Sequence, residues 1–172
     1  MKKSTIIKIE QISELLRLCE FPENQKFKLL YKASEDGFNS KSFHEKCDGI
    51  KNTFTIVKSI NENISGGYTD SAWDSNGRFI NGTDSFIFSF TNQVNEPFKA
   101  KCTNYQRSIF GNPNYGPIFG KDDLTIYLDS NTNQKSFSHF GSSYEYKTYG
   151  ETILAGSKNF HTTDIEVYEK LN

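Results

Sequence analysis

The segment FTIVKSINENISGGYTDSAW, residues 54–73, constrains the fold more than any other part of the chain. Phe54 and Ile56 point to one side of an extended chain while the residues between them point to the other, which is the two-residue period of a β-strand. The NEN triplet at residues 61–63 supplies a turn, because asparagine tolerates left-handed backbone angles and bonds its own main chain. Residues 64–68 return with the same period. The segment therefore predicts a β-hairpin.

The paired glycines Gly66 and Gly67 interrupt the second strand of this hairpin. Glycine inside a strand weakens it, so a pair usually marks a bulge or a place where another backbone comes close. One interpretation is a kinked strand beneath a neighbouring loop. The other is a surface at which a ligand or a partner is recognised.

Rings dominate the apolar part of the sequence, with 15 Phe and 9 Tyr among 172 residues. Aromatic side chains favour pleated, half-buried surfaces, so we expect a β-rich fold with a phenylalanine core. By contrast, residues 74–84 and 109–123 are rich in Asn, Gly and Pro and are predicted to be loops, the second one folded over the core. Alternation predicts further strands at residues 27–31, 85–90, 98–102, 124–128, 135–140 and 164–171.

About seven or eight short strands with few helices indicate one mainly β (α+β) domain, a two-sheet antiparallel β-sandwich flanked by a few helices. Ile9, Ile12 and Leu16 recur at helical spacing ahead of Pro22. This spacing predicts an amphipathic helix over residues 6–19.

The chain is accordingly divided into an N-terminal amphipathic helix with its linker, residues 1–24, and a domain over residues 25–172. The helix is expected to dock on that domain, and the alternative is a linker helix that awaits a partner. A second, short helix is predicted at residues 40–47, with Asn39 or Ser40 as its cap.

The charge balance and the lack of long apolar runs argue against several classes of protein. Twenty basic against 21 acidic residues leave a net charge of −1, so we expect no binding to nucleic acid and no polybasic attachment to a membrane. No apolar run reaches the length of a signal peptide or a membrane span, so no membrane insertion is expected. Cys19, Cys47 and Cys102 are widely spaced, which is a poor disulfide framework and favours a reduced, cytoplasmic compartment.

Candidates for catalysis are few. Cys47 and His44 stand on one turn of a predicted helix as a candidate nucleophile and base, although a cysteine beside a buried phenylalanine is usually a small core residue. Asp48 is adjacent in sequence but is expected to face elsewhere on the helix. His44 and Cys47 also have the spacing of zinc ligands, yet no second pair matches them. The sequence therefore predicts no catalytic residue, no metal and no cofactor.

Several motifs in series resemble those of the TLDc domain family: LLYKASEDGFNSKSFHEKCDG, TFTIVKS, ISGGYT followed by Trp73, GPIFG, DLTIY, LAGSKNF and IEVYE. They follow the order of the family from Lys26 to Tyr168. The resemblance implies a β-sandwich of two antiparallel sheets flanked by helices, and a role in oxidative-stress resistance. In several members it also implies binding to the vacuolar proton-pumping ATPase, while no catalytic mechanism is settled for the family.

In this family, glycines of the hairpin and of the loop before the FG pair are tied to pump binding, and by motif they fall on Gly66 and Gly116. The sequence departs from the family at Ser65, where members often carry a bulky apolar residue. We therefore predict a non-enzymatic interaction domain that binds and regulates the pump from the cytoplasm, peripheral to organelle membranes through the pump. Its predicted contact residues are Gly66, Gly67, Tyr68, Tyr115, Gly116, Phe119 and Gly120, with the two tyrosines as aromatic anchors.

Two rival hypotheses stay open. The first is a thiol-based antioxidant or hydrolytic enzyme that uses Cys47 with His44, or a peroxide-reactive Cys102, and it requires an exposed thiol of low pKa. The second is a structural domain of a larger assembly that docks through the helix at residues 6–19.

Overall fold

The structure is a computed structural model that describes residues 1, 4–145 and 148–172. It is mostly β, with two six-stranded antiparallel sheets and short helices around them, so the predicted fold class is confirmed. The helices are η1 (Ile9–Gln11), α1 (Ile12–Leu18), α2 (Ala33–Asp36), α3 (Ser40–Cys47) and η2 (Tyr105–Arg107). The strands are β1 (Phe27–Lys32), β2 (Thr53–Ser59), β3 (Ile64–Thr69), β4 (Arg78–Ile80), β5 (Phe86–Thr91), β6 (Phe98–Lys101), β7 (Ile109–Gly111), β8 (Tyr115–Phe119), β9 (Leu124–Tyr127), β10 (Ser136–Phe137), β11 (Asn159–Phe160) and β12 (Thr162–Lys170).

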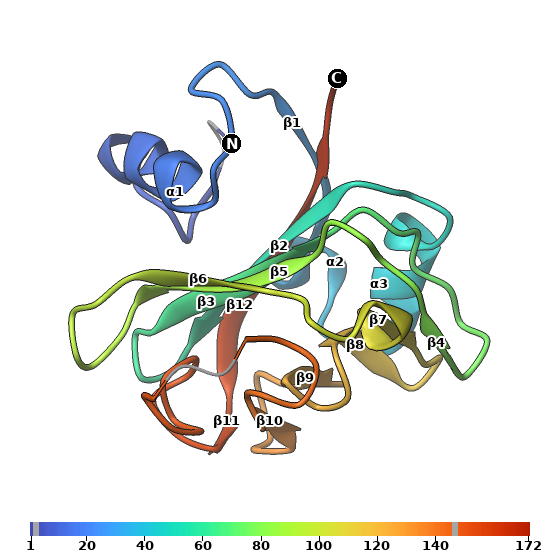
Figure 1. Ribbon diagram of the computed structural model, residues 1–172. Helices are drawn as coiled ribbons and strands as arrows, with labels where there is room; N and C mark the ends of the chain where they lie inside the picture. The colour runs from blue at the N-terminus through green and yellow to red at the C-terminus, as the bar shows by residue number, and fades with distance from the viewer. Residues whose placement is uncertain (2–3, 146–147) are drawn as a thin grey trace.

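The two sheets are stacked. Sheet I has the strand order β1-β12-β2-β3-β5-β6, and sheet II has the order β11-β10-β9-β8-β7-β4. Figure 1 shows sheet I crossing the molecule, with α1 on one side of it and sheet II on the other. The last strand, β12, lies between β1 and β2 and pairs with both of them, so the end of the chain is built into the sheet.

The hairpin predicted at residues 54–73 is confirmed as β2 and β3, in the middle of sheet I. At its turn the left-handed backbone angle belongs to Glu62, with φ of 63°. Asn63 is buried instead, and its side-chain amide donates to the carbonyl of Ile153 at 3.0 Å. Strand β2 is buried on both faces, because each face of sheet I is covered.

Sheet I separates two hydrophobic cores. Successive side chains along each of its strands point to opposite faces, so they enter one core and the other in turn. In β5, Ile87 points into the core between the sheets, whereas Phe86 and Phe88 point into a second core on the outer face. That outer core is rich in rings, with Phe54 stacked on Phe88 at 5.1 Å between centroids. Its residues from sheet I are Phe54, Ile56, Ile64, Tyr68, Phe86, Phe88, Phe90 and Tyr168.

The N-terminal segment closes the outer core. Ile6, Ile7 and Leu15 are buried against the rings of sheet I, and Phe21 packs edge-on against Phe54 at 5.4 Å between centroids. The predicted helix thus lies on the sheet, and its regular α-helical part, α1, is shorter than predicted.

Hydrogen bonds to a buried carboxylate fix the start of this segment. The hydroxyl of Ser4 donates to Oε2 of Glu166 at 2.6 Å, and the N–H of Thr5 donates to Oε1 at 2.8 Å. Glu166 is 0% exposed, so these bonds satisfy a carboxylate that would otherwise be costly to bury. The N-terminal segment is therefore held by polar as well as apolar contacts.

Two regions predicted to be loops contain strands. Residues 109–123 form β7 and β8, joined by a turn in which the N–H of Tyr115 donates to the carbonyl of Asn112 at 3.1 Å. Pro117 is accommodated in β8 because pairing with β9 shifts register between Tyr115 and Ile118. Residues 74–84 contain the edge strand β4, which pairs with β7. The breaker residues sit in turns and at the register shift, so composition alone gave the wrong prediction.

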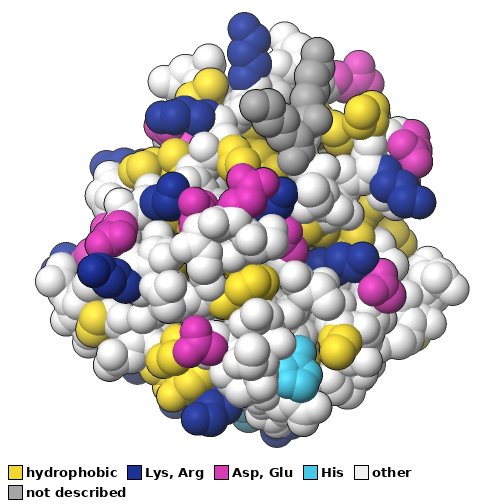
Figure 2. All heavy atoms as spheres, turned by 180° about the vertical axis from the view of Figure 1, so that it is seen from behind, with side chains coloured by type: hydrophobic (Ala, Val, Ile, Leu, Met, Phe, Trp, Pro, Cys, Tyr) yellow, Lys and Arg dark blue, Asp and Glu magenta, His cyan; other side chains and the backbone are white. Residues whose placement is uncertain are grey.

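Charges are mixed over the visible surface. Figure 2, which views the molecule from behind Figure 1, shows basic and acidic side chains interspersed, with apolar side chains in small groups between them. No helix in the part of the chain that the structure describes is long and apolar enough to cross a membrane.

Candidate functional site

The predicted glycine pair lies inside the molecule. Gly66 and Gly67 are buried in β3. A Cβ on Gly66 would overlap the carbonyl oxygen of Thr55, and a Cβ on Gly67 would lie 2.7 Å from the ring of Phe119 in sheet II. The pair is therefore needed where a neighbouring strand and a ring from the opposite sheet come close. It does not form the exposed turn surface that we expected.

Three more of the predicted contact residues also lie in the interior. Tyr68 is 2% exposed, and its hydroxyl donates to Oδ1 of Asn52 at 3.0 Å. Phe119 is 0% exposed, and Gly116 is buried in β8, where a Cβ would lie 3.4 Å from Ile126. A partner has no direct access to these groups in the folded domain, so any influence they have on binding must act through the fold.

Gly120 closes a turn around a buried carboxylate. Its φ is 69°, and a Cβ there would overlap Oδ2 of Asp123. Asp123 accepts hydrogen bonds at 2.9 Å from the N–H groups of Gly141, Ser142 and Ser143. Burial raises the pKa of the Asp123 carboxyl, and these N–H groups partly offset the effect. The role of Gly120 is thus to shape the β8–β9 turn.

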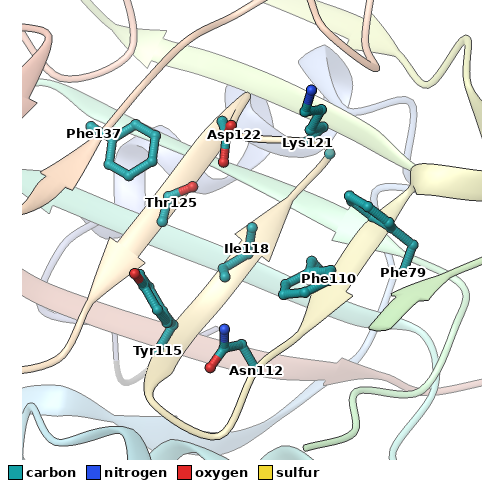
Figure 3. A pocket seen from close by; sticks show the side chains of 10 residues that line it. Phe79, Phe110, Asn112, Tyr115, Ile118, Lys121, Asp122, Thr125 and Phe137 are labelled. Carbon is teal, nitrogen blue, oxygen red and sulfur yellow. The ribbon is translucent and has the colours of Figure 1, made fainter. Parts of the chain in front are cut away.

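Tyr115 is the predicted residue whose side chain reaches the surface. Its ring packs edge-on against Tyr127, 5.0 Å between centroids, and borders a hollow of about 300 Å³. Figure 3 shows this hollow, which we call the sheet II hollow, on the outer face of the sheet. Its floor is a row of side chains from five adjacent strands: Phe79 of β4, Phe110 of β7, Ile118 of β8, Thr125 of β9 and Phe137 of β10.

Strand register explains this row. Phe79 lies opposite Phe110, and Thr125 lies opposite both Ile118 and Phe137. Neighbouring residues such as Ile109, Phe119 and Ile126 point the other way, into the core between the sheets. The rings of Phe79 and Phe110 contact each other at 4.8 Å between centroids. The row is therefore a continuous, largely apolar face.

One polar atom interrupts the apolar floor. Thr125 is 2% exposed, and its Oγ1 has no hydrogen-bond partner in the described part of the structure. Figure 3 shows the Thr125 side chain between those of Phe137 and Ile118, and its Oγ1 has almost no exposed surface. An unpaired buried hydroxyl costs about 1–3 kcal/mol. Thr125 thus holds an unused hydrogen-bonding group at the bottom of the site.

Basic side chains surround the sheet II hollow. Lys121 lies on its rim, Arg107 lies over the ring of Phe79 at 5.1 Å, and Lys135 lies over the ring of Tyr127 at 5.1 Å. None of the three basic groups has a carboxylate partner among the described residues. One carboxylate, that of Asp122, also lines the hollow. The residues that line the hollow thus carry one charge of each sign, while Arg107 and Lys135 lie on rings beside it.

His44 fixes the turn at one end of the hollow. Its Nε2 lies 2.8 Å from the carbonyl oxygen of Asn112 and 3.0 Å from that of Tyr115. Its Nδ1 lies 2.7 Å from Oδ1 of Asp48. The prediction that Asp48 faces elsewhere on the helix is wrong. Asp48 directly follows α3, and its carboxylate reaches back over one helical turn to the ring of His44. His44 is thus a positioning residue for the β7–β8 turn.

The thiols lie away from any open site. Cys19, Cys47 and Cys102 are all buried, and burial raises the pKa of each thiol. Cys47 lies in the core between the sheets, while both ring nitrogens of His44 face other groups, so the structure does not form the proposed pair. The described residues include no group of three or more His, Cys, Asp and Glu side chains suited to a metal ion.

Sequence reasoning missed most of the hollow. Phe79, Phe110 and Ile118 were all assigned to predicted loops, the second of which was expected to fold over the core. The usable signal was alternation within the short strands, since Ile109 and Phe119 point inward beside outward-facing Phe110 and Ile118. The cross-strand register that joins the row was not readable from the sequence.

The fold is a two-sheet β-sandwich. The N-terminal segment closes the outer face of sheet I, whereas the outer face of sheet II is open. The family model of the TLDc domain matches residues 1–170, nearly the whole chain. The chain therefore belongs to the TLDc domain family. No curated protein matches the sequence at a significant level.

Proposed function

We propose that this chain is a non-enzymatic protein-interaction domain that binds and regulates the vacuolar proton-pumping ATPase. It acts in the cytoplasm, at organelle membranes only through the pump, and supports resistance to oxidative stress. The observation that carries the proposal is membership of the TLDc domain family over residues 1–170.

Two structural features support binding over thiol chemistry. The three cysteines are buried, and burial raises the pKa of each thiol, which works against a thiolate nucleophile. The open surface on sheet II consists mainly of rings, which are typical anchors of protein interfaces.

The test is capture from a native cell extract by the immobilised domain, with recovered pump subunits measured by mass spectrometry. We expect wild type to recover the subunits and Tyr115→Ala to recover fewer, because Tyr115 borders the open surface. Ile60→Ala is the matched control, since Ile60 is 56% exposed on the β2–β3 turn of the other sheet. Recovery of no pump subunits by the folded wild-type domain would contradict the proposal.

Thiol labelling separates the proposal from an enzyme that uses Cys47 or Cys102. We expect all three cysteines to react with a thiol reagent only after the chain is unfolded, because all three are buried. Rapid labelling of either candidate in the folded domain at neutral pH would favour the thiol-based enzyme instead.

A further inference from the structure

We propose that Asn76 is a site of spontaneous deamidation, a covalent modification that yields isoaspartate beside the edge strand β4 of sheet II. The sequence contains two Asn-Gly pairs, Asn76-Gly77 and Asn81-Gly82. Such pairs react readily, because glycine has no side chain to hinder the attack of its nitrogen on the preceding side chain. Two features of the structure separate the pairs and lead to Asn76. The inference does not depend on which partner the domain binds.

The first feature is the freedom of the backbone. Asn76, Gly77 and Arg78 are exposed in the loop between β3 and β4. Gly77 has a φ of 67°, and a Cβ there would meet no atom within 4 Å. This pair therefore has room to rotate until the nitrogen of Gly77 faces Cγ of Asn76. Gly82 is buried, and a Cβ on it would lie 2.5 Å from Oγ of Ser108. Packing thus holds the second pair in place.

The second feature is the state of the attacking nitrogen. The N–H of Gly82 donates to the carbonyl of Tyr105 at 3.0 Å, whereas the N–H of Gly77 donates to no group in the described part of the chain. The glycines of the two Asp-Gly pairs, Gly37 and Gly49, also donate to main-chain carbonyls, each at 2.9 Å. A nitrogen that must first give up a hydrogen bond attacks more slowly. Among these four pairs of the described chain, Gly77 is the glycine whose nitrogen is ready to react.

The reaction needs only water. The nitrogen of Gly77 forms a bond to Cγ of Asn76, the C–N bond of the side-chain amide breaks, and ammonia leaves with the proton of the Gly77 N–H. Water then opens the cyclic succinimide. Opening at Cγ gives aspartate, while opening at the main-chain carbonyl carbon gives isoaspartate, in which the main chain runs through Cγ. No atom is oxidised or reduced, and both products carry a carboxylate in place of a neutral amide.

The modified loop adjoins the sheet II hollow. The N–H of Asn76 donates to Oδ1 of Asp74 at 3.0 Å, and Oδ2 of Asp74 pairs with Arg78 at 2.9 Å. A new carboxylate at residue 76 therefore lies beside an existing one. Isoaspartate also lengthens the main chain just before β4, whose Phe79 packs on Phe110 at the hollow. Deamidation thus alters one wall of the hollow.

The test follows both Asn-Gly pairs of the folded domain during incubation at mildly alkaline pH. Peptide mapping by mass spectrometry detects the conversion, and an isoaspartate-specific methyltransferase labels the isoaspartate. We expect Asn76 to convert more than about 10-fold faster than Asn81, since Gly82 must first give up its hydrogen bond and its packing. In guanidinium chloride that unfolds the chain, the two pairs should convert at comparable rates, because glycine follows both asparagines.

Variants locate the effect. Asn76→Gln should remove the fast reaction, since the longer glutamine side chain closes its ring far more slowly, whereas Asn81→Gln should leave the fast reaction unchanged. Isoaspartate at residue 76 should move the backbone amide signals of Phe79 and Phe110 in the NMR spectrum. Asn76→Asp adds the charge without lengthening the main chain, so it should move these signals less.

Equal conversion of the two pairs in the folded domain would overturn the inference. So would an Asn76 that stays intact in the folded domain while the unfolded chain reacts at both pairs. Unchanged signals of Phe79 and Phe110 after conversion would overturn the link to the sheet II hollow.

Discussion

The outer faces of the two sheets are built from similar residues but end in different surroundings. Sheet I turns rings such as Phe54 and Phe88 outward, and residues from the N-terminal segment bury them completely. Sheet II turns Phe79, Phe110 and Phe137 outward, and all three stay partly exposed around a hollow. The same alternation of aromatic strands therefore gives a closed core on one side and an open surface on the other.

This difference separates residues that hold the fold from residues available for binding. On sheet I the paired glycines and Tyr68 serve packing, even though they are the most unusual part of the sequence. On sheet II the rings of Phe79, Phe110 and Tyr115 keep part of their surface exposed around the hollow. Unusual residues thus mark the closed side, while ordinary phenylalanines mark the open one.

Truncations on the two outer faces should show the largest contrast. Leu15→Ala on the closed side is expected to lower the free energy of unfolding by about 2–5 kcal/mol, because a fully buried leucine leaves a cavity. Phe137→Ala on the open side should cost less than about 2 kcal/mol, since its ring is already partly exposed. Urea unfolding measures both, and equal losses would contradict the distinction between the faces.

Added methyl groups should distinguish the glycines. Gly67→Ala is expected to cost about 1–3 kcal/mol, because its Cβ would press into the ring of Phe119. Gly116→Ala should cost less than about 1 kcal/mol, since its Cβ would make an ordinary contact with Ile126. Thermal unfolding measures the difference.

A double variant checks the cause of the Gly67 effect. Phe119→Leu removes the ring that a Cβ on Gly67 would meet. In that background Gly67→Ala should cost less than it does in the wild type. An unchanged cost would show that the clash with Phe119 is not the reason for glycine at this position.

Removing the His44 side chain should loosen one end of the hollow. His44→Ala is expected to cost about 1–3 kcal/mol, because it removes the hydrogen bonds of the ring to the Asp48 carboxylate and to the β7–β8 turn. His139→Ala is the control. The His139 side chain forms a surface pair with Glu151, so its removal should cost less than about 1 kcal/mol.

The smallest expected effect is a gain. Thr125→Val should stabilise the free domain by up to about 1 kcal/mol, because it replaces an unpaired buried hydroxyl by a methyl group of similar shape. A destabilised Thr125→Val protein would show that the hydroxyl has a partner within the fold.

The strands that alternate over several residues were predictable from the sequence, and so was the sandwich they form. The hairpin at residues 54–73 and the strand SFIFSF show this, because a period of two can be read locally. β4 and β7 were missed, since each is three residues long and lies among Asn, Gly and Pro. Strands this short are held by pairing with their neighbours, which the sequence does not display.

The site was harder to predict than the fold. Tyr115 was found as a candidate surface anchor, but the glycines were placed on the surface because their packing partner, the ring of Phe119, comes from a distant segment. The hollow depends on register across five strands of sheet II. Each of its residues is unremarkable alone, and only the paired strands bring them together.

The most direct test of the account is a backbone NMR titration of the labelled domain with a partner that it captures from the native cell extract. The account predicts that chemical-shift changes gather at Phe79, Phe110, Ile118 and Thr125, while the amides of Phe54 and Phe88 stay unchanged. Changes centred on sheet I, with release of the N-terminal segment, would contradict it.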